Sequence, residues 1–425
     1  MLMRKSRFSR PGAELHRRTR YRLTRTTDQA NVVGRGFRSP AALFCLWIAL
    51  SLVLVNLRWS SLIAPTFQWQ TLPFMILALA VFAMIMTVDP GNGRVWDPAP
   101  LRPALLWILA LYYSCAFAVS WTVPLVQIVR GQPYEVYGFG LPGLHILALA
   151  LSGYLAVRYF SLFLSSRSLG DLARALLPVA FLLLIANRSA ISFVALAWTI
   201  LMIRRLRVRF IGLVLLIAGI LLFLIAFGVL GTARLGVQIF SATGTYGSDS
   251  AIANVSRATD AFYRTGLPTD WLWVYSYFTS PIVNLDQAFA FSGEALCGRS
   301  CDLLALTVWE LMPDVFSVRV GPLLGLDEFD KAVFLKVPEL TASTAFGSAV
   351  GYAGLVGAAL MLLALVGLVI LVYGALNRSD VREEGLALLG CVLFFSFFEN
   401  MIAYSPLFFQ LCLPLLRTRW RTPFL

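Results

Sequence analysis

Three arginines occupy unusual positions in this largely apolar chain and could bind phosphate oxygens. Arg188 interrupts the apolar run I-A-N-R-S-A of residues 185–190, where a guanidinium is costly unless it faces a polar cavity or reaches headgroup phosphates. Arg257 and Arg264 are seven residues apart, so one helix would place both on one face. Because arginine binds phosphate in a bidentate manner, we predict an anionic site around the three; for the pair, ordinary solvated charges are the alternative. Weaker candidates are Arg234, Arg299, Arg319, Lys331 and Lys336.

Glu399 and His145 are the first candidates for proton transfer. Glu399 lies between Phe398 and Asn400 near the end of an apolar stretch, where burial would suit a carboxyl group for acid–base work. His145 lies at the start of another apolar stretch and titrates near neutrality. A structural role is the alternative for each, and the general base stays open between them and a further carboxylate. Those carboxylates are Asp249, Asp260, Asp270, Asp286, Glu294, Asp302, Glu310, Asp314, Asp327, Glu328, Asp330, Glu339 and Glu135.

Several kinds of chemistry have no support in the sequence. It contains no P-loop, no dinucleotide fingerprint, no HExxH and no GxSxG motif, and only two histidines. Cys297 and Cys301 could form a small-loop disulfide in an oxidising compartment, but no second pair or histidine cluster accompanies them. We therefore predict neither a metal nor a cofactor.

The elements that position these residues are apolar helices. The chain has 425 residues, is 59% hydrophobic and has a mean hydropathy of +0.76, which excludes an ordinary soluble protein. A bilayer core needs roughly 20 apolar residues per helix. We predict an all-α polytopic membrane protein with about ten transmembrane helices, near residues 41–57, 71–88, 104–123, 143–164, 172–186, 189–203, 210–230, 345–373, 385–401 and 404–416.

Charge placement predicts the topology. Of the 35 basic residues, 25 fall in the two termini and in alternate loops, while ten fall on the opposite side. The positive-inside rule places both termini in the cytoplasm and the long polar segment outside. The net charge of +13 is therefore a topology signal, and we predict no nucleic-acid partner.

The chain divides into five parts. These are a basic, disordered cytoplasmic tail (1–39), seven transmembrane helices (40–231), a large outer loop (232–344), three transmembrane helices (345–416) and a basic cytoplasmic tail (417–425). Within the loop we predict short helices at 251–263 and 303–311. Residues 271–291 are apolar enough to enter the membrane but contain Pro281, which predicts a broken, re-entrant segment; an aromatic belt at the headgroups is the alternative.

Three stretches resemble the Wzy-type polymerases of O-antigen and oligosaccharide repeat units. Residues 187–194 (N-R-S-A-I-S-F-V) are similar to the start of a mid-chain helix in that family. Residues 275–285 (Y-S-Y-F-T-S-P-I-V-N-L) are similar to its Y-x-x-x-P-x-x-N-L stretch in the large periplasmic loop. Residues 341–357 resemble its loop-to-helix entry, except that Tyr352-Ala-Gly354 stands where the family often has Asp-Phe-Gly.

The resemblance implies a glycosyltransferase of the bacterial inner membrane. A glycan chain on undecaprenyl pyrophosphate would be transferred, with inversion and without metal or cofactor, to a lipid-linked repeat unit at the periplasmic face. It implies that Arg188 binds the pyrophosphate together with Arg257 and Arg264. Tyr275, Tyr277, Pro281 and Asn284 would shape the acceptor site. Partners would be lipid-linked oligosaccharides, the bilayer and a chain-length regulator protein.

Three other functions remain open. An O-antigen ligase of the same superfamily differs only in its acceptor. A polysaccharide flippase would carry charged residues within several spans, whereas the spans here look nearly free of charge. A structural subunit of a polysaccharide assembly complex would have no activity alone.

Overall fold

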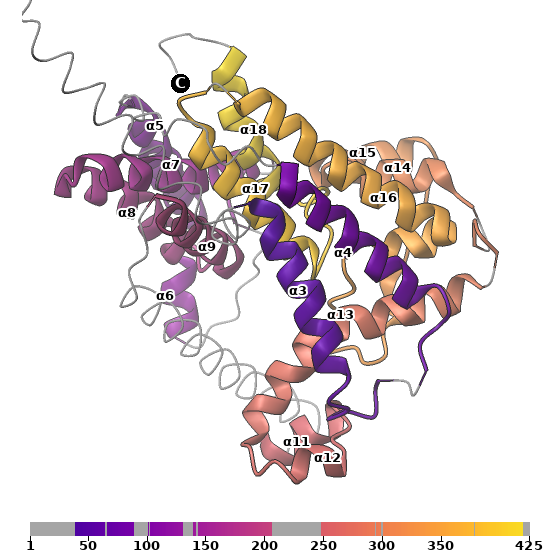
Figure 1. Ribbon diagram of the computed structural model, residues 1–425. Helices are drawn as coiled ribbons and strands as arrows, with labels where there is room; N and C mark the ends of the chain where they lie inside the picture. The colour runs from indigo at the N-terminus through magenta and orange to yellow at the C-terminus, as the bar shows by residue number, and fades with distance from the viewer. Residues whose placement is uncertain are drawn as a thin grey trace, which may run out of the picture.

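The computed structural model of this chain is built from helices (Figure 1). It describes residues 39–63, 66–88, 101, 103–130, 139–141, 143–205, 248–293, 295–298, 301–377 and 379–419. Within these residues there are fifteen α-helices, one 3-10 helix and a single isolated β-bridge, between Ser60 and Ala258. The prediction of an all-α fold is therefore confirmed for the described part of the chain.

Nine of the ten predicted spans coincide with helices. They are α3 (Pro40–Val55), α4 (Thr71–Val88), α5 (Ala104–Ser120), α7 (Leu144–Ser166), α8 (Leu169–Leu184), α9 (Arg188–Arg205), α16 (Gly347–Leu376), α17 (Arg382–Ser396) and α18 (Ser405–Arg419). A further short helix, α6 (Pro124–Val129), follows α5. The tenth span (210–230), the loop start (232–247) and most of the N-terminal tail lie outside the described residues.

Two of these helices, α7 and α16, have the length and apolar composition needed to cross a bilayer. Four further helices, α3, α4, α5 and α18, contain shorter apolar stretches of 10 to 17 residues. Ten transmembrane helices therefore remain a prediction.

Two contacts join helix ends that the charge pattern places on the same side. At the predicted inner side, Ser39 Oγ lies 3.2 Å from the Tyr373 hydroxyl, before α3 and near the end of α16. At the predicted outer side, the Ala345 N–H donates to the Ser396 carbonyl (2.8 Å), before α16 and at the end of α17. In Figure 1, α5, α7, α8 and α9 form one side of the bundle, and α3, α4, α16 and α17 form its centre. These two contacts are compatible with the predicted topology, which remains a prediction.

Charged side chains lie inside three of the helices; Arg158 falls within a predicted span, whereas Arg204, Glu383 and Glu384 lie just outside the predicted spans. The Arg158 guanidinium in α7 is 2.8 Å from the Glu384 carboxylate in α17, and both side chains are 0% exposed. Arg204 in α9 pairs with Glu383 in α17 at 2.8 Å. These pairs, which we call the inner network, stand toward the predicted cytoplasmic ends, where they fasten α7 and α9 to α17.

The described part of the predicted outer loop, from residue 248 onward, is also largely helical. It contains α11 (Ser248–Val255), α12 (Asp260–Tyr263), α13 (Thr269–Ser292), α14 (Leu303–Glu310), α15 (Asp314–Leu323) and the 3-10 helix η3 (Lys331–Phe334). The helix predicted at 303–311 is confirmed. The one predicted at 251–263 is wrong, because Arg257 adopts a φ of +46° and separates α11 from α12.

The break predicted at Pro281 is also wrong, because α13 continues through it. Proline cannot donate to the carbonyl of Tyr277 four residues earlier. The hydroxyl of Ser280 donates to that carbonyl instead, at 3.1 Å. The helix is almost wholly buried against α3, α4 and α16, so residues 271–291 form a core helix of the protein.

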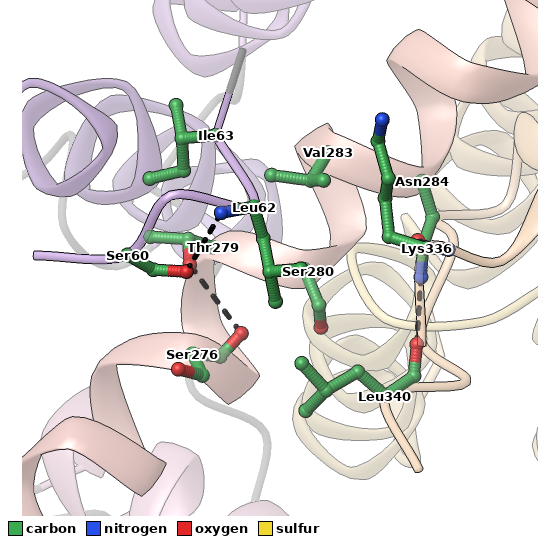
Figure 2. Close-up of a pocket in the computed structure, with 10 residues that line it drawn as sticks. All are labelled: Ser60, Leu62, Ile63, Ser276, Thr279, Ser280, Val283, Asn284, Lys336 and Leu340. Atoms are coloured by element: carbon green, nitrogen blue, oxygen red, sulfur yellow. Dashed lines mark hydrogen bonds between the residues drawn. The ribbon is translucent and has the colours of Figure 1, made fainter. Parts of the chain in front are cut away.

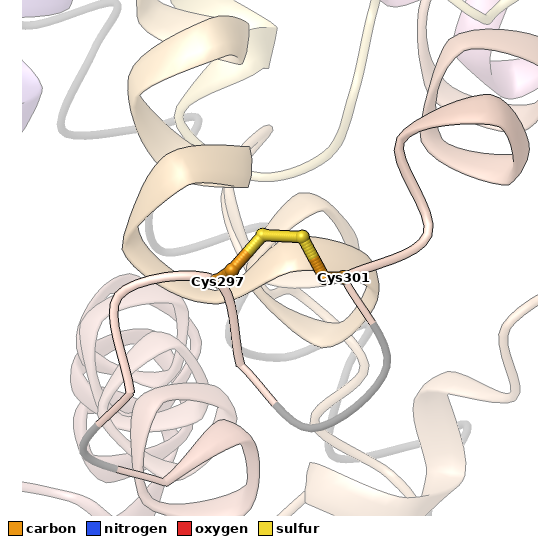
Figure 3. Close-up of a disulfide and its surroundings, with 2 residues drawn as sticks. All are labelled: Cys297 and Cys301. Atoms are coloured by element: carbon orange, nitrogen blue, oxygen red, sulfur yellow. A yellow bond between two sulfur atoms is a disulfide. The ribbon is translucent and has the colours of Figure 1, made fainter.

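A disulfide between Cys297 and Cys301, left open by the sequence, closes a small loop against α16 (Figure 3). Helix α16 is interrupted at Ala353 and Gly354, whose backbone angles are not helical. The Asp302 N–H donates to the Tyr352 carbonyl (3.1 Å), and the Val356 N–H donates to the Leu296 carbonyl (3.0 Å). The disulfide loop therefore satisfies backbone groups that the interruption leaves without helical partners.

Replacing Gly354 by alanine should destabilise the fold. Its φ is +55° and its ψ is −141°, and an added Cβ would stand 2.5 Å from the Gly298 nitrogen. Such a conformation costs roughly 1–3 kcal/mol for other residues. Gly374→Ala, in the same helix with open space around it, is the matched control. Thermal unfolding in detergent should show a lower midpoint for Gly354→Ala alone; equal midpoints for both variants would contradict this account.

Candidate active site

Glu310, Lys331 and Glu399 meet between three separate segments of the chain. Glu310 ends α14, Lys331 begins η3 and Glu399 lies in the turn between α17 and α18. The Lys331 ammonium is 2.5 Å from the Glu399 carboxylate. The Lys331 charge also acts on Glu310. We call these three residues the carboxylate–lysine cluster.

The turn after α17 holds the cluster in place. The Asn400 side-chain amide donates to both the carbonyl and the carboxylate of Glu310, each at 2.7 Å. The Ala403 carbonyl accepts from the Asp314 N–H at 2.8 Å, which fixes the start of α15 to the same turn. From the opposite side, the Phe329 N–H donates to the Tyr352 hydroxyl at 2.6 Å. The cluster is thus positioned by hydrogen bonds from α14, α16 and the 397–404 turn.

The two carboxylates have different surroundings. Burial raises the pKa of Glu310 to about 7, against the opposing effects of Lys331 and of the Asn400 hydrogen bond. Desolvation alone would lower the pKa of Lys331, but the charges of Glu399 and Glu310 raise it above its usual range. The Glu399 side chain is 38% exposed and the Lys331 side chain 34%. A buried carboxyl with a pKa near neutrality beside a solvent-reachable, lysine-paired carboxylate is an arrangement that suits proton transfer.

Glu310 should make the folded protein more stable at lower pH. Because its pKa rises from 4.5 to about 7 on folding, this stabilisation is complete below 4.5 and is lost as the pH rises through 7. It amounts to roughly 3 kcal/mol. Asp314, with a pKa raised to about 6 mainly by burial, acts in the same direction.

Glu310→Gln should therefore flatten the pH dependence of the thermal midpoint, measured in detergent on both sides of neutrality. The exposed loop residue Glu339 supplies the control, since Glu339→Gln should keep the wild-type dependence. A wild-type slope in Glu310→Gln would show that other groups produce it.

Glu399, predicted from the sequence, belongs to the cluster but not to a helix. Helix α17 ends at Ser396, so Glu399 stands in the turn beyond it rather than in an apolar span. Phe398 next to it stacks on Tyr277 of α13, with ring centroids 5.7 Å apart. Of the aromatic residues predicted to contact substrate, Tyr277 thus packs on the residue that precedes Glu399.

Arg188 is exposed at the first turn of α9. The preceding Asn187 caps this helix, as its side-chain oxygen accepts from the Ala190 N–H at 2.9 Å. Further along α9, the Phe193 ring contacts Phe395 at the end of α17 and Tyr404 in the 397–404 turn. The ring centroids are 4.6 and 5.6 Å apart, respectively. Arg188 thus projects from the end of α9 that packs near this turn.

His145 lies elsewhere, in a contact between α5 and α7. Its Nδ1 is 3.2 Å from the Tyr112 hydroxyl, and Phe139 packs edge-on at 5.5 Å. Within the described part of the chain, no hydrogen bond or ion pair connects it to the carboxylate–lysine cluster.

Tyr275 and Asn284 hold other segments against α13. The Tyr275 hydroxyl accepts from the Trp59 N–H at 3.2 Å. The Asn284 amide donates to the carbonyls of Leu340 and Ala342, at 2.7 and 2.8 Å, and its oxygen accepts from the Lys336 N–H at 3.1 Å.

The cavity beside Asn284 is small (Figure 2). Its lining includes Ser60, Ser276 and Asn284, and its volume of about 10 Å³ has room for about one water molecule. Tyr275, Pro281 and Asn284 are buried, and the cavity cannot admit a sugar. In this conformation their side chains organise the fold.

Arg257 and Arg264 are not on one helical face, contrary to prediction. Arg257 lies between α11 and α12, and Arg264 follows the end of α12. Both are exposed on this helix pair, which stands apart at the foot of the bundle in Figure 1. Both are accessible to solvent, but the structure does not bring them into one site with Arg188.

Glu310 and Lys331 are the cluster members that the sequence did not single out. Glu310 was one of many carboxylates and Lys331 a weaker phosphate candidate, because nothing in their spacing joins them to Glu399. The described residues contain no group of histidine, cysteine or acidic side chains arranged to hold a metal ion. No protein-family model, curated protein or solved structure matches this chain.

Proposed function

We propose that this chain is a glycosyltransferase of the bacterial inner membrane that polymerises lipid-linked oligosaccharide repeat units. The observation that carries the proposal is the carboxylate–lysine cluster, which stands at the helix ends that the charge pattern assigns to the periplasm. In this proposal ten helices span the membrane and both termini are cytoplasmic. The substrates are glycans on undecaprenyl pyrophosphate, and a chain-length regulator is a further partner.

The chemistry needs one base and one anion-binding group. An acceptor hydroxyl attacks the anomeric carbon of the glycan chain, the new C–O bond forms, and the bond from that carbon to pyrophosphate breaks. We assign Glu399 as the base that takes the hydroxyl proton, because its carboxylate is partly exposed and lies in the cluster beside Lys331. We assign Arg188 to the charge developing on pyrophosphate. Tyr277, beside Phe398, is the aromatic residue placed to stack on a sugar.

The position of the inner network argues against the transporter alternative. Buried charges in membrane helices often mark transport pathways. Here Arg204 and Glu383 stand at the last turn of α9 and the first turn of α17. Such an end position fits fastening of the helices better than a binding site halfway through the membrane.

An Arg188→Ala variant tests the proposal. In a polymerase-deficient host, wild type should make a ladder of long polymers and Arg188→Ala, at equal expression, should not. Arg130→Ala removes another exposed arginine at a helix end and should keep the ladder. A full-length ladder from Arg188→Ala would disprove its role. Transfer of one preformed chain to a different acceptor by wild type would favour the ligase, and movement of intact repeat units without transfer would favour a transporter.

A further inference from the structure

Helix α15 shows the reverse of the pattern expected of a helix on a soluble surface. Its buried positions are small: Ser317 and Gly321 face inward, and a Cβ on Gly321 would stand 2.3 Å from the Trp309 ring of α14. Its most exposed apolar side chains are large, namely Phe316, Val318 and Leu323, while Val315 and Val320 are half-buried. Soluble amphipathic helices bury their large apolar residues, whereas helices in lipid bury small residues against their neighbours.

The outward face is strongly apolar. Leu323 is 84% exposed, and the other large apolar residues exposed along this segment are Phe316, Val318 and Leu324. Leu303 and Leu304 at the start of α14 add to the exposed apolar surface. Single exposed apolar residues are ordinary, but several together on one short hairpin mark a surface that meets an apolar partner.

The attachment of α15 indicates which partner this is. The Val315 N–H donates to Ser405 Oγ at 2.8 Å, and the Phe316 ring lies 6.0 Å from Phe409, so α15 starts against the first turns of α18. Helix α14 packs on α16. Figure 1 shows α14 and α15 at the flank of the bundle beside α16, not at its far end beyond it. The hairpin is therefore mounted on the side of two predicted spans, where lipid would surround it.

We propose that α15 lies in the outer leaflet of the bilayer, with lipid acyl chains covering Phe316, Val318, Leu323 and Leu324. This rests on the membrane placement in the proposed function. The guanidinium of the exposed Arg319, on the same helix, donates to the Val315 carbonyl, and its long side chain is of the kind that can extend to headgroup phosphates. We predicted that residues 271–291 enter the membrane without crossing it. In the placement proposed here, the α14–α15 hairpin does so instead.

The placement has a consequence for the candidate active site. Glu310 ends α14 and Asp314 begins α15, so the link between the two helices borders the carboxylate–lysine cluster. A substrate carried on a lipid would meet the cluster by moving sideways within the leaflet, without leaving the membrane.

Hydroxyl-radical footprinting of the unaltered protein, reconstituted in nanodiscs that hold one chain each, tests the inference. Phe316 should be modified several-fold less than Tyr263 of α12, although both side chains are exposed in the structure. Trp107 of α5, exposed and within a predicted span, should be protected as well.

Each departure from this result overturns the inference in a recognisable way. Modification of Phe316 at the rate of Tyr263, with Trp107 protected, would place α15 in water while leaving the spans intact. Modification of all three would remove the membrane placement itself. Protection of Phe316 only in nanodiscs that hold several chains would make this face a contact between copies.

Discussion

Replacing Arg158 by methionine should lower the free energy of unfolding by about 3 kcal/mol, because it leaves the buried Glu384 carboxylate with only the more distant Arg205 guanidinium, 3.8 Å away, as an ion-pair partner. Arg158 and Glu384 are 2.8 Å apart and neither side chain is exposed. The hydroxyl of Ser161 also donates to Glu384, and Arg205 keeps a positive charge near it, so the loss should fall at the low end of the range for a broken buried pair. Chemical unfolding in detergent micelles, followed by tryptophan fluorescence, measures the loss.

Two control variants separate the buried charge from general damage to α7. In Arg158→Met/Glu384→Met the buried pair is gone, so stability should recover part of the way to wild type, although Asp380 and Arg205 each lose an ion-pair partner. Arg174→Met removes an exposed arginine that pairs with Asp171 in α8, and it should change stability by less than about 1 kcal/mol. If the double variant is no more stable than Arg158→Met, the loss comes from packing around Arg158 and not from the weakened pairing of Glu384.

The helices could be predicted because each carries its own signal. Apolar runs of sufficient length define α3 to α5, α7 to α9 and α16 to α18 without knowledge of their neighbours. Boundaries were less predictable. Helix α13 continues through Pro281 because the Ser280 hydroxyl satisfies the Tyr277 carbonyl, and sequence rules for proline do not include that rescue.

The candidate site could be predicted only in part because its members meet through tertiary packing. Glu399 stood out by its apolar neighbours, whereas Glu310 and Lys331 become significant only when α14 and η3 fold against the 397–404 turn. The pKa of Glu310 depends on burial and on Lys331, which no local pattern encodes.

Asn284 shows a second reason why the site could be predicted only in part from the sequence. Its amide suggested sugar recognition, but both amide hydrogens and the oxygen are used to hold residues 336–342. Hydrogen-bonding capacity that suits a ligand equally suits a loop, and only the folded structure decides between them.

Glu399→Gln should slow polymer formation by about 10²- to 10⁴-fold if Glu399 is the general base, since the amide cannot take the acceptor proton. Stability should change little, because the Lys331–Glu399 pair is more than one-third exposed on the Glu399 side. The rate is measured with purified protein and lipid-linked repeat units, and the thermal midpoint is measured in parallel. A large loss of rate with an unchanged midpoint distinguishes a chemical role from a structural one.

His145→Gln and Glu339→Gln complete this experiment. His145 contacts Tyr112 rather than the cluster, so His145→Gln should retain the rate, and the exposed Glu339 should be equally dispensable. The pH–rate profile adds a readout that altered packing would not move: the limb assigned to the base should vanish in Glu399→Gln. The opposite result, in which His145→Gln slows polymer formation and Glu399→Gln does not, would place the base at the α5–α7 contact. The role of the carboxylate–lysine cluster would then be to fasten the 397–404 turn to α14.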